Sequence, residues 1–573
     1  MPPLRGRLTD WLLLASLWTW QPAFADRPPA AAIASAHPSA TAAGLQVLDA
    51  GGNAFDAAVA VAAALAVVEP HGSGLGGGGF WLLHRAHDGR TLMLDARERA
   101  PLSARPDMYL GADGAPMPGA SLDGPLAAGI PGIPAALAHL ADGYGSLPLA
   151  QTLAPAIRLA RDGFDVDRIY RLKASARLDA LRGSPAAASQ FLDQGELPAT
   201  GARLRQPDLA DTLQRLATEG RDGFYQGPTA QAMVEGVRAA GGIWTLEDLA
   251  AYIVVEREPV TVDYRGWRVI SASPPSSGGI ALAQMLNILG GYDLPALSRA
   301  ERIHLLVEAM RRAYRDRAVY LGDPDQVQVP IARLTHPYYA AGLARDIDPG
   351  RATPSLAPAT LGASGNDTTH LSVLDGDGNR VAATLSINLP FGSGFVPPGT
   401  GVLLNDEMDD FSIQPGVPNA YGLIGGSANA IAPGKRMLSS MSPTFVESDN
   451  GVAILGTPGG SRIITMVLQA ILALAEAEDD GTASADWVAA PRLHHQFLPD
   501  EILYEPGALD TPTRTALEAM GHRLRESPRR YGNMQLIYWD RRREAVQAAS
   551  DPRGIGQAEV LALPAVPSDT SNR

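Results

Sequence analysis

Thr368 is the residue whose place in the chain suggests nucleophilic chemistry. It precedes an alternating apolar run, 369–374, and a turn rich in Asp and Gly, 375–379, separates this run from a second one, 381–388. Two alternating runs around such a turn predict a β-hairpin. Antiparallel pairing about the turn then places Ser386 opposite Thr368.

The Thr368 hydroxyl would need a base to act as a nucleophile, and a free α-amine on the same residue is one solution. Such an amine titrates near pH 7.7–8.0, so it can accept a proton at neutral pH. The Pro/Ala/Gly/Ser-rich segment 348–365 is typical of a flexible linker. Cleavage after Asp367 would expose the amine close to Ser386 and Asn388. The alternative is an ordinary strand, because β-branched Thr favours strands without any chemistry.

The glycine pair Gly459-Gly460 is a second candidate element. It precedes Ser461, which could cap a helix predicted over the apolar stretch 463–472. Glycine allows a ligand to approach the backbone closely, and a helix N-terminus favours negative charge. The pair could therefore form an oxyanion hole; the alternative is a structural turn before a helix.

An acidic cluster follows the hairpin. Glu407, Asp409 and Asp410 are interrupted by Met408, and Phe411 follows them. Carboxylates gathered near a nucleophile, together with the amide supplied by the hairpin, could hold an ammonium group. A solvated acidic loop is the alternative.

Arg97 is a candidate for binding a carboxylate. It follows a strand predicted over 91–95. A guanidinium can bind a carboxylate through two parallel hydrogen bonds, which Lys cannot reproduce. A lone Arg is otherwise a surface charge, and Arg99 is the nearby alternative for the role.

Two other motifs indicate structure more than chemistry. The glycine-rich run 72–79 precedes an apolar strand and lacks the Lys-Ser/Thr pair of a phosphate-binding loop, so close backbone packing explains it better. His494 and His495 are adjacent and have no further ligands at metal spacing, so we interpret them as structural. We expect no metal site.

The remaining pattern predicts a mixture of helices and strands. The Ala-rich stretch 45–68 predicts a helix whose apolar part is buried in the core, and Thr245 predicts a helix start. Further predictions are strands at 260–263 and 267–271, a helix at 280–289, and mainly helices across 129–165 and 223–252.

Composition limits the class of protein. The 573 residues have 46% hydrophobic content and a net charge of −14, and they include no Cys. The length predicts at least two structural units. The negative charge argues against binding to nucleic acid or to an anionic membrane surface, and the lack of Cys excludes disulfides and thiol chemistry.

The first residues are typical of an export signal. Arg5 and Arg7 precede an apolar run, 11–18, and an Ala-x-Ala site at 23–25 follows. The run is too short to span a membrane, which needs about 20 residues. We therefore expect residues 1–25 to be a signal peptide and the protein to be periplasmic or secreted.

Several motifs in one order make the chain similar to a known family. The second half resembles the small subunit of a γ-glutamyltransferase, also called glutathione hydrolase, and the first half resembles its large subunit. The motifs that carry the resemblance are 69–79, 95–101, 274–279, 368–370, Asn388, 404–412, 415–419, 438–443, 458–462, 491–496 and 549–553.

The resemblance implies a role for each candidate residue. Thr368 would be the nucleophile, oriented by Ser386, where the family commonly has Thr. The amides of Gly459 and Gly460 would form the oxyanion hole. Asn388, Glu407 and Asp410 would bind the α-amino group of the substrate. Arg97, Ser439 and Ser440 would bind its α-carboxylate. Tyr421, in a lid loop over residues 415–430, would screen the bound group. Asp409 would be structural.

The same resemblance implies a fold and a reaction. The fold would be the four-layer αββα sandwich, an α/β (α+β) architecture, of N-terminal-nucleophile hydrolases. Self-cleavage between Asp367 and Thr368 would give a large subunit, 26–367, and a small one, 368–573, that stay together as a heterodimer. The enzyme would use no cofactor and would transfer γ-glutamyl groups, from glutathione above all, to water or to acceptor amino acids and peptides.

Two other functions remain open at this point. A related acylase would act on glutaryl or cephalosporin side chains, which lack the substrate amine, so the set Asn388, Glu407 and Asp410 and the lid residue Tyr421 count against it. A non-catalytic periplasmic binding protein for glutamyl compounds would not need Thr368 or the glycine pair.

Overall fold

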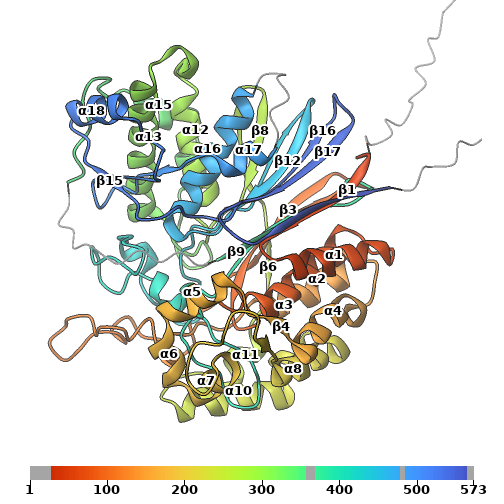
Figure 1. Ribbon diagram of the computed structural model, residues 1–573. Helices are drawn as coiled ribbons and strands as arrows, with labels where there is room; N and C mark the ends of the chain where they lie inside the picture. The colour runs from red at the N-terminus through yellow and green to blue at the C-terminus, as the bar shows by residue number, and fades with distance from the viewer. Residues whose placement is uncertain (1–26, 357–367, 478–483, 564–573) are drawn as a thin grey trace, which may run out of the picture.

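Alternating apolar residues build two antiparallel sheets that stack face to face in the middle of the molecule (Figure 1). This computed structural model describes residues 27–356, 368–477 and 484–563. Helices cover the outer face of each sheet. The layers are thus helices, sheet, sheet and helices, which confirms the sandwich expected from the resemblance.

The first sheet has seven strands and holds the predicted hairpin near its centre. Its strands, in spatial order, are β18 (Gln557–Ala562), β1 (Ala30–Ser35), β9 (Thr369–Leu374), β10 (Arg380–Ser386), β2 (Gly78–Arg85), β3 (Arg90–Ala96) and β6 (Val255–Arg257). The second sheet has six, in the order β17 (Ala545–Ser550), β16 (Gln535–Asp540), β12 (Gly451–Gly456), β11 (Thr444–Ser448), β8 (Trp267–Ser271) and β7 (Val260–Tyr264). Smaller sheets pair β13 (Leu493–His494), β14 (Ile502–Tyr504) and β15 (Leu524–Glu526), and β4 (Phe164–Asp165) with β5 (Arg203–Leu204).

Each helical layer packs against one sheet through its apolar face. The layer on the first sheet contains α1 (Pro38–Asp49), α2 (Ala54–Val68), α3 (Ile133–Gly143), α4 (Leu149–Asp162), α5 (Arg168–Ala176), α6 (Leu178–Gly183), α7 (Pro185–Phe191), α8 (Pro207–Glu219), α9 (Asp222–Tyr225), α10 (Gly227–Ala239) and α11 (Leu246–Ala250). The layer on the second contains α12 (Gly278–Leu289), α13 (Arg299–Tyr320), α14 (Ile331–Leu334), α15 (Pro337–Ala344), α16 (Ile463–Glu476), α17 (Ser484–Ala489) and α18 (Thr511–Ala519). Short 3₁₀ turns are η1 (Pro125–Ala127), η2 (Leu294–Ala296), η3 (Glu407–Asp410), η4 (Ser427–Asn429) and η5 (Gly460–Arg462).

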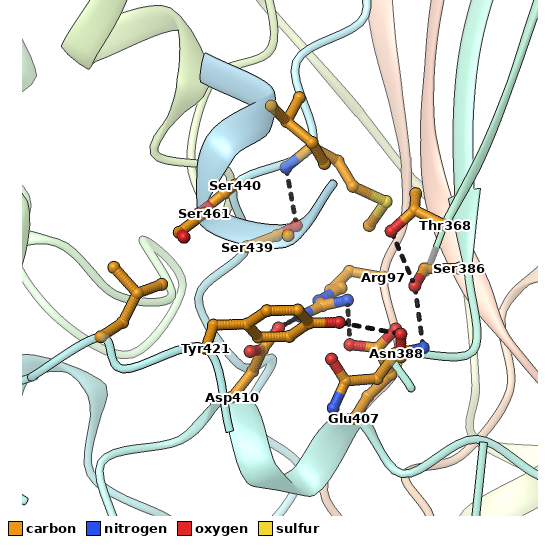
Figure 2. Close-up of a pocket in the computed structure, with 14 residues that line it drawn as sticks. Arg97, Thr368, Ser386, Asn388, Glu407, Asp410, Tyr421, Ser439, Ser440 and Ser461 are labelled. Atoms are coloured by element: carbon orange, nitrogen blue, oxygen red, sulfur yellow. Dashed lines mark hydrogen bonds and ion pairs between the residues drawn. The ribbon is translucent and has the colours of Figure 1, made fainter. Parts of the chain in front are cut away.

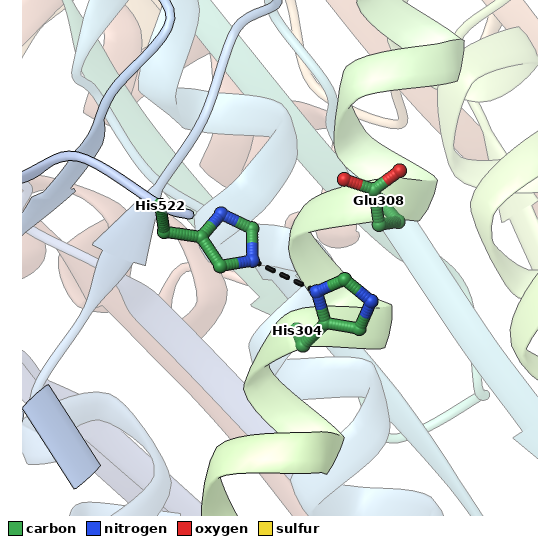
Figure 3. A group of neighbouring side chains, drawn as sticks. All are labelled: His304, Glu308 and His522. Atoms are coloured by element: carbon green, nitrogen blue, oxygen red, sulfur yellow. Dashed lines mark hydrogen bonds between the residues drawn. The ribbon is translucent and has the colours of Figure 1, made fainter. Parts of the chain in front are cut away.

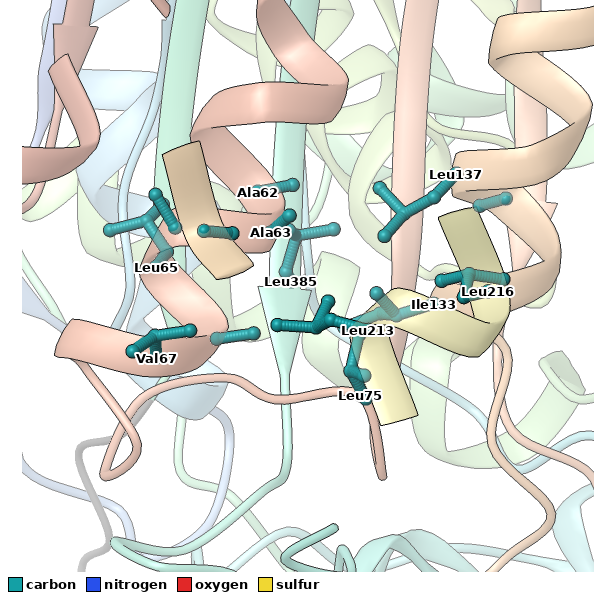
Figure 4. Close-up of a cluster of buried hydrophobic side chains, with 14 of the residues drawn as sticks. Ala62, Ala63, Leu65, Val67, Leu75, Ile133, Leu137, Leu213, Leu216 and Leu385 are labelled. Carbon is teal, nitrogen blue, oxygen red and sulfur yellow. The ribbon is translucent and has the colours of Figure 1, made fainter. Parts of the chain in front are cut away.

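The hairpin strands separate two hydrophobic cores. Leu385 of β10 faces the core formed with the helices of the first layer, where α2, α3 and α8 meet (Figure 4). Ala382 of the same strand belongs to the core between the sheets and the second helical layer. This alternation follows the period of two along a strand. The hairpin is therefore buried on both faces, which fixes its position firmly.

The register of the hairpin is as predicted. Strand β10 pairs with β9 so that Leu385 lies opposite Thr369, which leaves Ser386 beside Thr368. In the turn, the Asp375 carboxylate accepts hydrogen bonds from the amides of Asp377 and Asn379. The turn chemistry read from the sequence therefore sets the geometry of the candidate nucleophile.

Three predictions need correction. The helix expected over 45–68 is two helices, because Asn53 forms a capping box that starts α2 after the break at 50–53. Ser461 caps no helix: the chain makes the 3₁₀ turn η5 there, and α16 begins at Ile463. The linker expected over 348–365 is held in place in its described part, where Thr353 donates its amide to Glu308.

Other predictions are confirmed or fall outside the described residues. Thr245 caps α11, β7 and β8 include the two predicted strands, and α12 includes the predicted helix. The signal peptide, Asp367 and most of the expected linker lie outside the described residues. None of the described helices combines the length and the apolar character needed to cross a membrane.

Candidate active site

Thr368 immediately precedes strand β9, and the residue is 6% exposed. Its Oγ1 lies 3.4 Å from the Ser386 Oγ. The Ser386 Oγ also accepts a hydrogen bond of 2.8 Å from the backbone amide of Asn388. Either of the two hydroxyls can be the donor in the contact between Thr368 and Ser386. Two strands of one hairpin thus orient the hydroxyl of Thr368.

Asn388 holds the end of the hairpin in a strained conformation. Its φ is +75°, a region that non-glycine residues rarely adopt. Its Nδ2 donates to the Asp406 carbonyl at 3.0 Å, and its carbonyl accepts from the Tyr421 hydroxyl at 2.8 Å. These bonds leave Oδ1 of Asn388 as the atom that can accept from a ligand. Such strain persists where the surroundings fix the backbone, as at binding sites.

Arg97 lies beside three carboxylates, and we call Arg97, Glu98, Glu407 and Asp410 the substrate-side cluster. The Arg97 side chain is 1% exposed, with Nη1 2.6 Å from the Glu407 carboxylate and Nη2 2.5 Å from that of Asp410. Glu98 is the third acid, at 3.4 Å. Arg99 instead donates to the Gly434 carbonyl, so Arg97 is the arginine that reaches this site.

The substrate-side cluster contains three carboxyl groups and one guanidinium. Burial raises the pKa of Glu407 to about 7 and that of Glu98 well above its usual range. Burial also lowers the pKa of Arg97, but the charges of Glu407, Glu98 and Asp410 outweigh this, and the net pKa is raised. One buried oxygen of Glu98 and one of Glu407 have no hydrogen-bond partner among the described residues. A cation that binds beside these carboxyl groups would favour their ionised forms.

Ser439 and Ser440 are oriented as donors. The Ser439 Oγ accepts from the Met441 amide at 3.1 Å, and the Ser440 Oγ accepts from a guanidinium nitrogen of Arg317 at 3.3 Å. Neither hydroxyl donates to another atom of the described residues. Each proton is therefore available to an acceptor in the pocket that both residues line. Two adjacent hydroxyl donors suit a carboxylate.

Gly459 and Gly460 have positive φ angles of 142° and 57°. A Cβ on Gly460 would lie 2.3 Å from the Tyr421 ring, and one on Gly459 would lie 2.6 Å from Met466. Both positions therefore require glycine for conformation and for space. Neither amide donates to a backbone carbonyl in the described part of the chain.

Tyr421, in the predicted lid loop over residues 415–430, covers the pocket. Its side chain is 6% exposed, and its hydroxyl points to Asn388 (Figure 2). Asn419 connects this loop to the acids: its Nδ2 donates to Asp410 at 3.0 Å, and its Oδ1 accepts from the Tyr421 amide. Asp409 points elsewhere and accepts from Ser121. These contacts hold the lid residue and Asp410 together.

Gln496 is a site contact that the sequence did not reveal. Its Oε1 accepts from the Ser461 hydroxyl at 2.6 Å, and its Nε2 donates to the Tyr421 carbonyl at 3.1 Å. It thereby ties the lid to the turn after Gly460. The side chain of His494 contacts the same Oε1 at 2.9 Å, and burial lowers the pKa of His494 to about 3, so the imidazole is neutral. Only the motif context around His494-His495 pointed to this region.

The predicted residues converge on one pocket. It contains about 280 Å³ of empty space, part of it open to solvent, between the hairpin, η3, the lid and η5. All predicted site residues in the described part of the chain line it except Gly459. The lining residues are Arg97, Thr368, Ser386, Asn388, Glu407, Asp410, Tyr421, Leu423, Ser439, Ser440, Met441, Gly460, Ser461 and Ile463.

A separate group of side chains has the composition of a metal site. His304, Glu308 and His522 offer ligand atoms within 4.8 Å of one another (Figure 3). The Glu308 carboxylate, however, accepts from Arg311 at 3.1 Å and from Arg312 at 2.6 Å. A cation would compete with two guanidinium groups for Glu308, so this group does not fit a metal. We call Glu308, Arg311 and Arg312, with Asp500, the α13 cluster.

Comparisons with known proteins point to one family. The model of the family Gamma-glutamyltranspeptidase matches residues 40–561. The glutathione hydrolase proenzyme of Escherichia coli (strain K12) is 44% identical over 532 residues, covering 91% of this chain and 90% of its own.

Solved structures are similar as well. The cephalosporin acylase from Bacillus halodurans has a TM-score of 0.81 at 29% identity, covering 93% of this chain and 96% of its own. The Helicobacter pylori gamma-glutamyltranspeptidase has a TM-score of 0.55 at 42% identity, covering 56% and 92%. The family model matches well over half of the chain, and the E. coli relative is similar along nearly its whole length. The chain is therefore an enzyme of the gamma-glutamyltranspeptidase family.

Proposed function

We propose that this enzyme processes itself between Asp367 and Thr368 and then transfers γ-glutamyl groups, from glutathione and related amides, to water or to acceptor amino acids and peptides. The observation that carries the proposal is the shared pocket. The Thr368 hydroxyl opens into the same space as an acid-rich cluster and two hydroxyl donors. A γ-glutamyl group carries an ammonium and a carboxylate at one end and its reactive carbonyl at the other.

Self-processing would use the same hydroxyl. Thr368 Oγ1 attacks the Asp367 carbonyl carbon, the C–N bond breaks, and the released nitrogen takes up a proton to become the Thr368 α-amine. Water then hydrolyses the ester, which leaves a carboxylate on Asp367 and restores the hydroxyl. The word proenzyme in the name of the E. coli relative supports a precursor.

The two products, 26–367 and 368–573, would stay associated because their strands alternate within the sheets. Strand β9 pairs with β1, and β10 pairs with β2, so the small product is inserted into a sheet of the large one. In the second sheet, β11 pairs with β8. Separation would expose both cores, so a stable heterodimer is expected.

In turnover, the Thr368 α-amine takes the proton of Oγ1, and the oxygen attacks the γ-carbonyl carbon. The amides of Gly459 and Gly460 stabilise the oxyanion of the tetrahedral intermediate. Its collapse breaks the C–N bond, and the leaving amine takes the proton. A γ-glutamyl ester on Thr368 then reacts with water or with an acceptor amine.

Recognition would divide the substrate between two sets of residues. Glu407, Asp410 and the Oδ1 of Asn388 bind the α-ammonium. Ser439 and Ser440, together with Arg97, bind the α-carboxylate. Tyr421 closes the pocket over the γ-glutamyl group and excludes water. The arginine-rich and apolar start of the sequence supports export, with residues 1–25 as the signal peptide.

A cephalosporin or glutaryl acylase is the second candidate function. The similarity to the B. halodurans acylase favours it. Glutaryl substrates lack the α-ammonium, however, and would leave Glu407 and Asp410 without a cation from the substrate. We therefore prefer γ-glutamyl substrates.

The test is to trap the ester. Purified enzyme is mixed with γ-glutamyl p-nitroanilide or with glutaryl p-nitroanilide, quenched in acid, digested and analysed by peptide mass spectrometry. The proposal predicts a γ-glutamyl adduct on the peptide that begins with Thr368. A glutaryl adduct alone would favour the acylase, and an adduct on another residue would contradict the assignment of Thr368.

A further inference from the structure

Arg317 is a buried cation that forms no direct ion pair in the described part of the chain. It lies in the last turn of α13, and its residue is 5% exposed. No carboxylate of the described residues forms an ion pair with it, although Arg311 and Arg312 on the same helix are both paired with Glu308. An unpaired buried charge is costly, so its retention calls for an explanation.

The guanidinium of Arg317 reaches the two serines of the pocket from behind. Its Nη2 donates to the Ser440 Oγ at 3.3 Å, and its Nε donates to the Ser277 Oγ at 3.0 Å. The Ser277 hydroxyl in turn donates to the Ser439 carbonyl at 2.7 Å. Arg317 therefore fixes Ser440 as a donor toward the pocket and places a positive charge immediately behind it.

Arg97, the other cation of the pocket, is already engaged. Its Nη1 and Nη2 contact Glu407 and Asp410, and its Nε donates to the Met437 carbonyl at 3.2 Å. A carboxylate entering the pocket thus meets one guanidinium whose charge is more than balanced by acids. The second guanidinium, that of Arg317, is influenced by the Asp410 charge but forms no ion pair with a carboxylate of the described residues.

We propose that Arg317 is a positioning residue for the substrate α-carboxylate, acting through Ser440 as the cation that balances this carboxylate when the pocket is filled. The proposal rests on the proposed function, because it assumes that the α-carboxylate binds at Ser439 and Ser440. It assigns the two ends of the substrate to opposite charge environments. Glu407 and Asp410 select the ammonium, and Arg317, behind Ser440, adds to Arg97 the positive charge that selects the carboxylate.

The test compares two donors that differ in one group. γ-Glutamyl p-nitroanilide carries the α-carboxylate, and 4-aminobutanoyl p-nitroanilide lacks it but keeps the amine and the reactive carbonyl. The ratio of their kcat/KM values measures discrimination for the carboxylate, which a general loss of stability would not change. In Arg317→Met we expect this ratio to fall about 10- to 100-fold, the value of a charge-assisted hydrogen bond. Arg317→Lys, which keeps the charge, should restore most of it.

Arg312→Met is the matched control, because it removes a buried arginine of the same helix that points away from the pocket. It should lower stability and leave the ratio unchanged. If Arg317→Met does not fold, Ser277→Ala decides, since it removes the hydroxyl that holds the Arg317 Nε; we expect a several-fold fall in the ratio. An unchanged ratio in the folded Arg317 variant, or in Ser277→Ala in its place, overturns the inference. A wild-type enzyme without activity on the γ-glutamyl donor would instead overturn the proposed function.

Discussion

Two buried charge clusters in this enzyme differ in their balance. In the substrate-side cluster, one guanidinium, Arg97, faces three carboxylates. In the α13 cluster, Glu308 receives two guanidinium groups and the Thr353 amide, and Arg311 also pairs with Asp500. The first retains acceptor capacity for another cation. The second is saturated by groups of the protein itself.

This difference distinguishes a cluster suited to binding a ligand from one that stabilises the fold. Burial raises the pKa of Glu308, but the hydrogen bond from Thr353 and the charges of Arg311 and Arg312 outweigh this, and its net pKa is lowered. The pKa of Glu407 is raised to about 7 instead. By residue type alone, the α13 cluster, with His304 and His522 nearby, would look like the better site for a cation. Its carboxylate Glu308 is already bonded to Arg311, Arg312 and Thr353, however, so the substrate-side cluster is the better candidate.

The largest expected effect comes from breaking the saturated cluster. Glu308→Gln keeps the shape but removes the negative charge between two buried guanidinium groups. We expect the free energy of unfolding to fall by about 3–5 kcal/mol, as when one partner of a buried pair is lost. Chemical denaturation of the purified enzyme measures it. Glu196→Gln, in an exposed pair with Arg182, is the control and should change stability by less than about 1 kcal/mol. A stability equal to the wild type would show that Glu308 is not the counter-charge.

Substitutions in the substrate-side cluster should lower activity more than stability. Asp410→Asn removes one of the residues that we propose bind the ammonium, but it leaves Arg97 with two acids. We expect kcat/KM for γ-glutamyl p-nitroanilide to fall about 30- to 1000-fold, with a melting temperature close to that of the wild type. Asp409→Asn is the neighbouring control, because Asp409 bonds Ser121 and the Ala420 amide and faces away from the pocket. Equal losses in both variants would argue against a specific role for Asp410.

A smaller effect is expected on the KM for the donor when the pH is raised. The pKa of Glu407 is raised to about 7, so its ionised form, which we propose binds the ammonium, increases between pH 6 and 8. KM for the donor should fall several-fold over this range, and Glu407→Gln should remove that change. For stability the sign is opposite: a carboxyl whose pKa is raised on folding stabilises the protein below its unfolded pKa, and this contribution is lost as pH rises through about 7. A KM that rises with pH in the wild type would contradict the role of Glu407.

The sequence predicted those parts of the site that depend on local pattern. The turn after β9 determined that Ser386 faces Thr368, because loop length and alternation fix a hairpin register. Arg97 meets Glu407 across 310 residues of sequence, and only the family resemblance pointed to that contact. No local pattern encodes such a pairing.

The predictions that failed did so for identifiable reasons. Ser461 looked like a helix cap, but the positive φ angles of Gly459 and Gly460 turn the chain into η5 first, and Ser461 bonds Gln496 instead. No sequence pattern singled out Arg317, which the structure places in the last turn of α13. Its unpaired state depends on what faces α13 in three dimensions, which the helical pattern does not contain.

The central claim is that Thr368 is a nucleophile released by self-cleavage, and intact-mass spectrometry with N-terminal sequencing tests it most directly. For the purified enzyme we predict two chains, the smaller beginning Thr368-Thr369-His370, and for Thr368→Ala a single uncut and inactive chain. A wild-type enzyme that is active as one unbroken chain, or a Thr368→Ala variant cut at the same bond, would contradict the account.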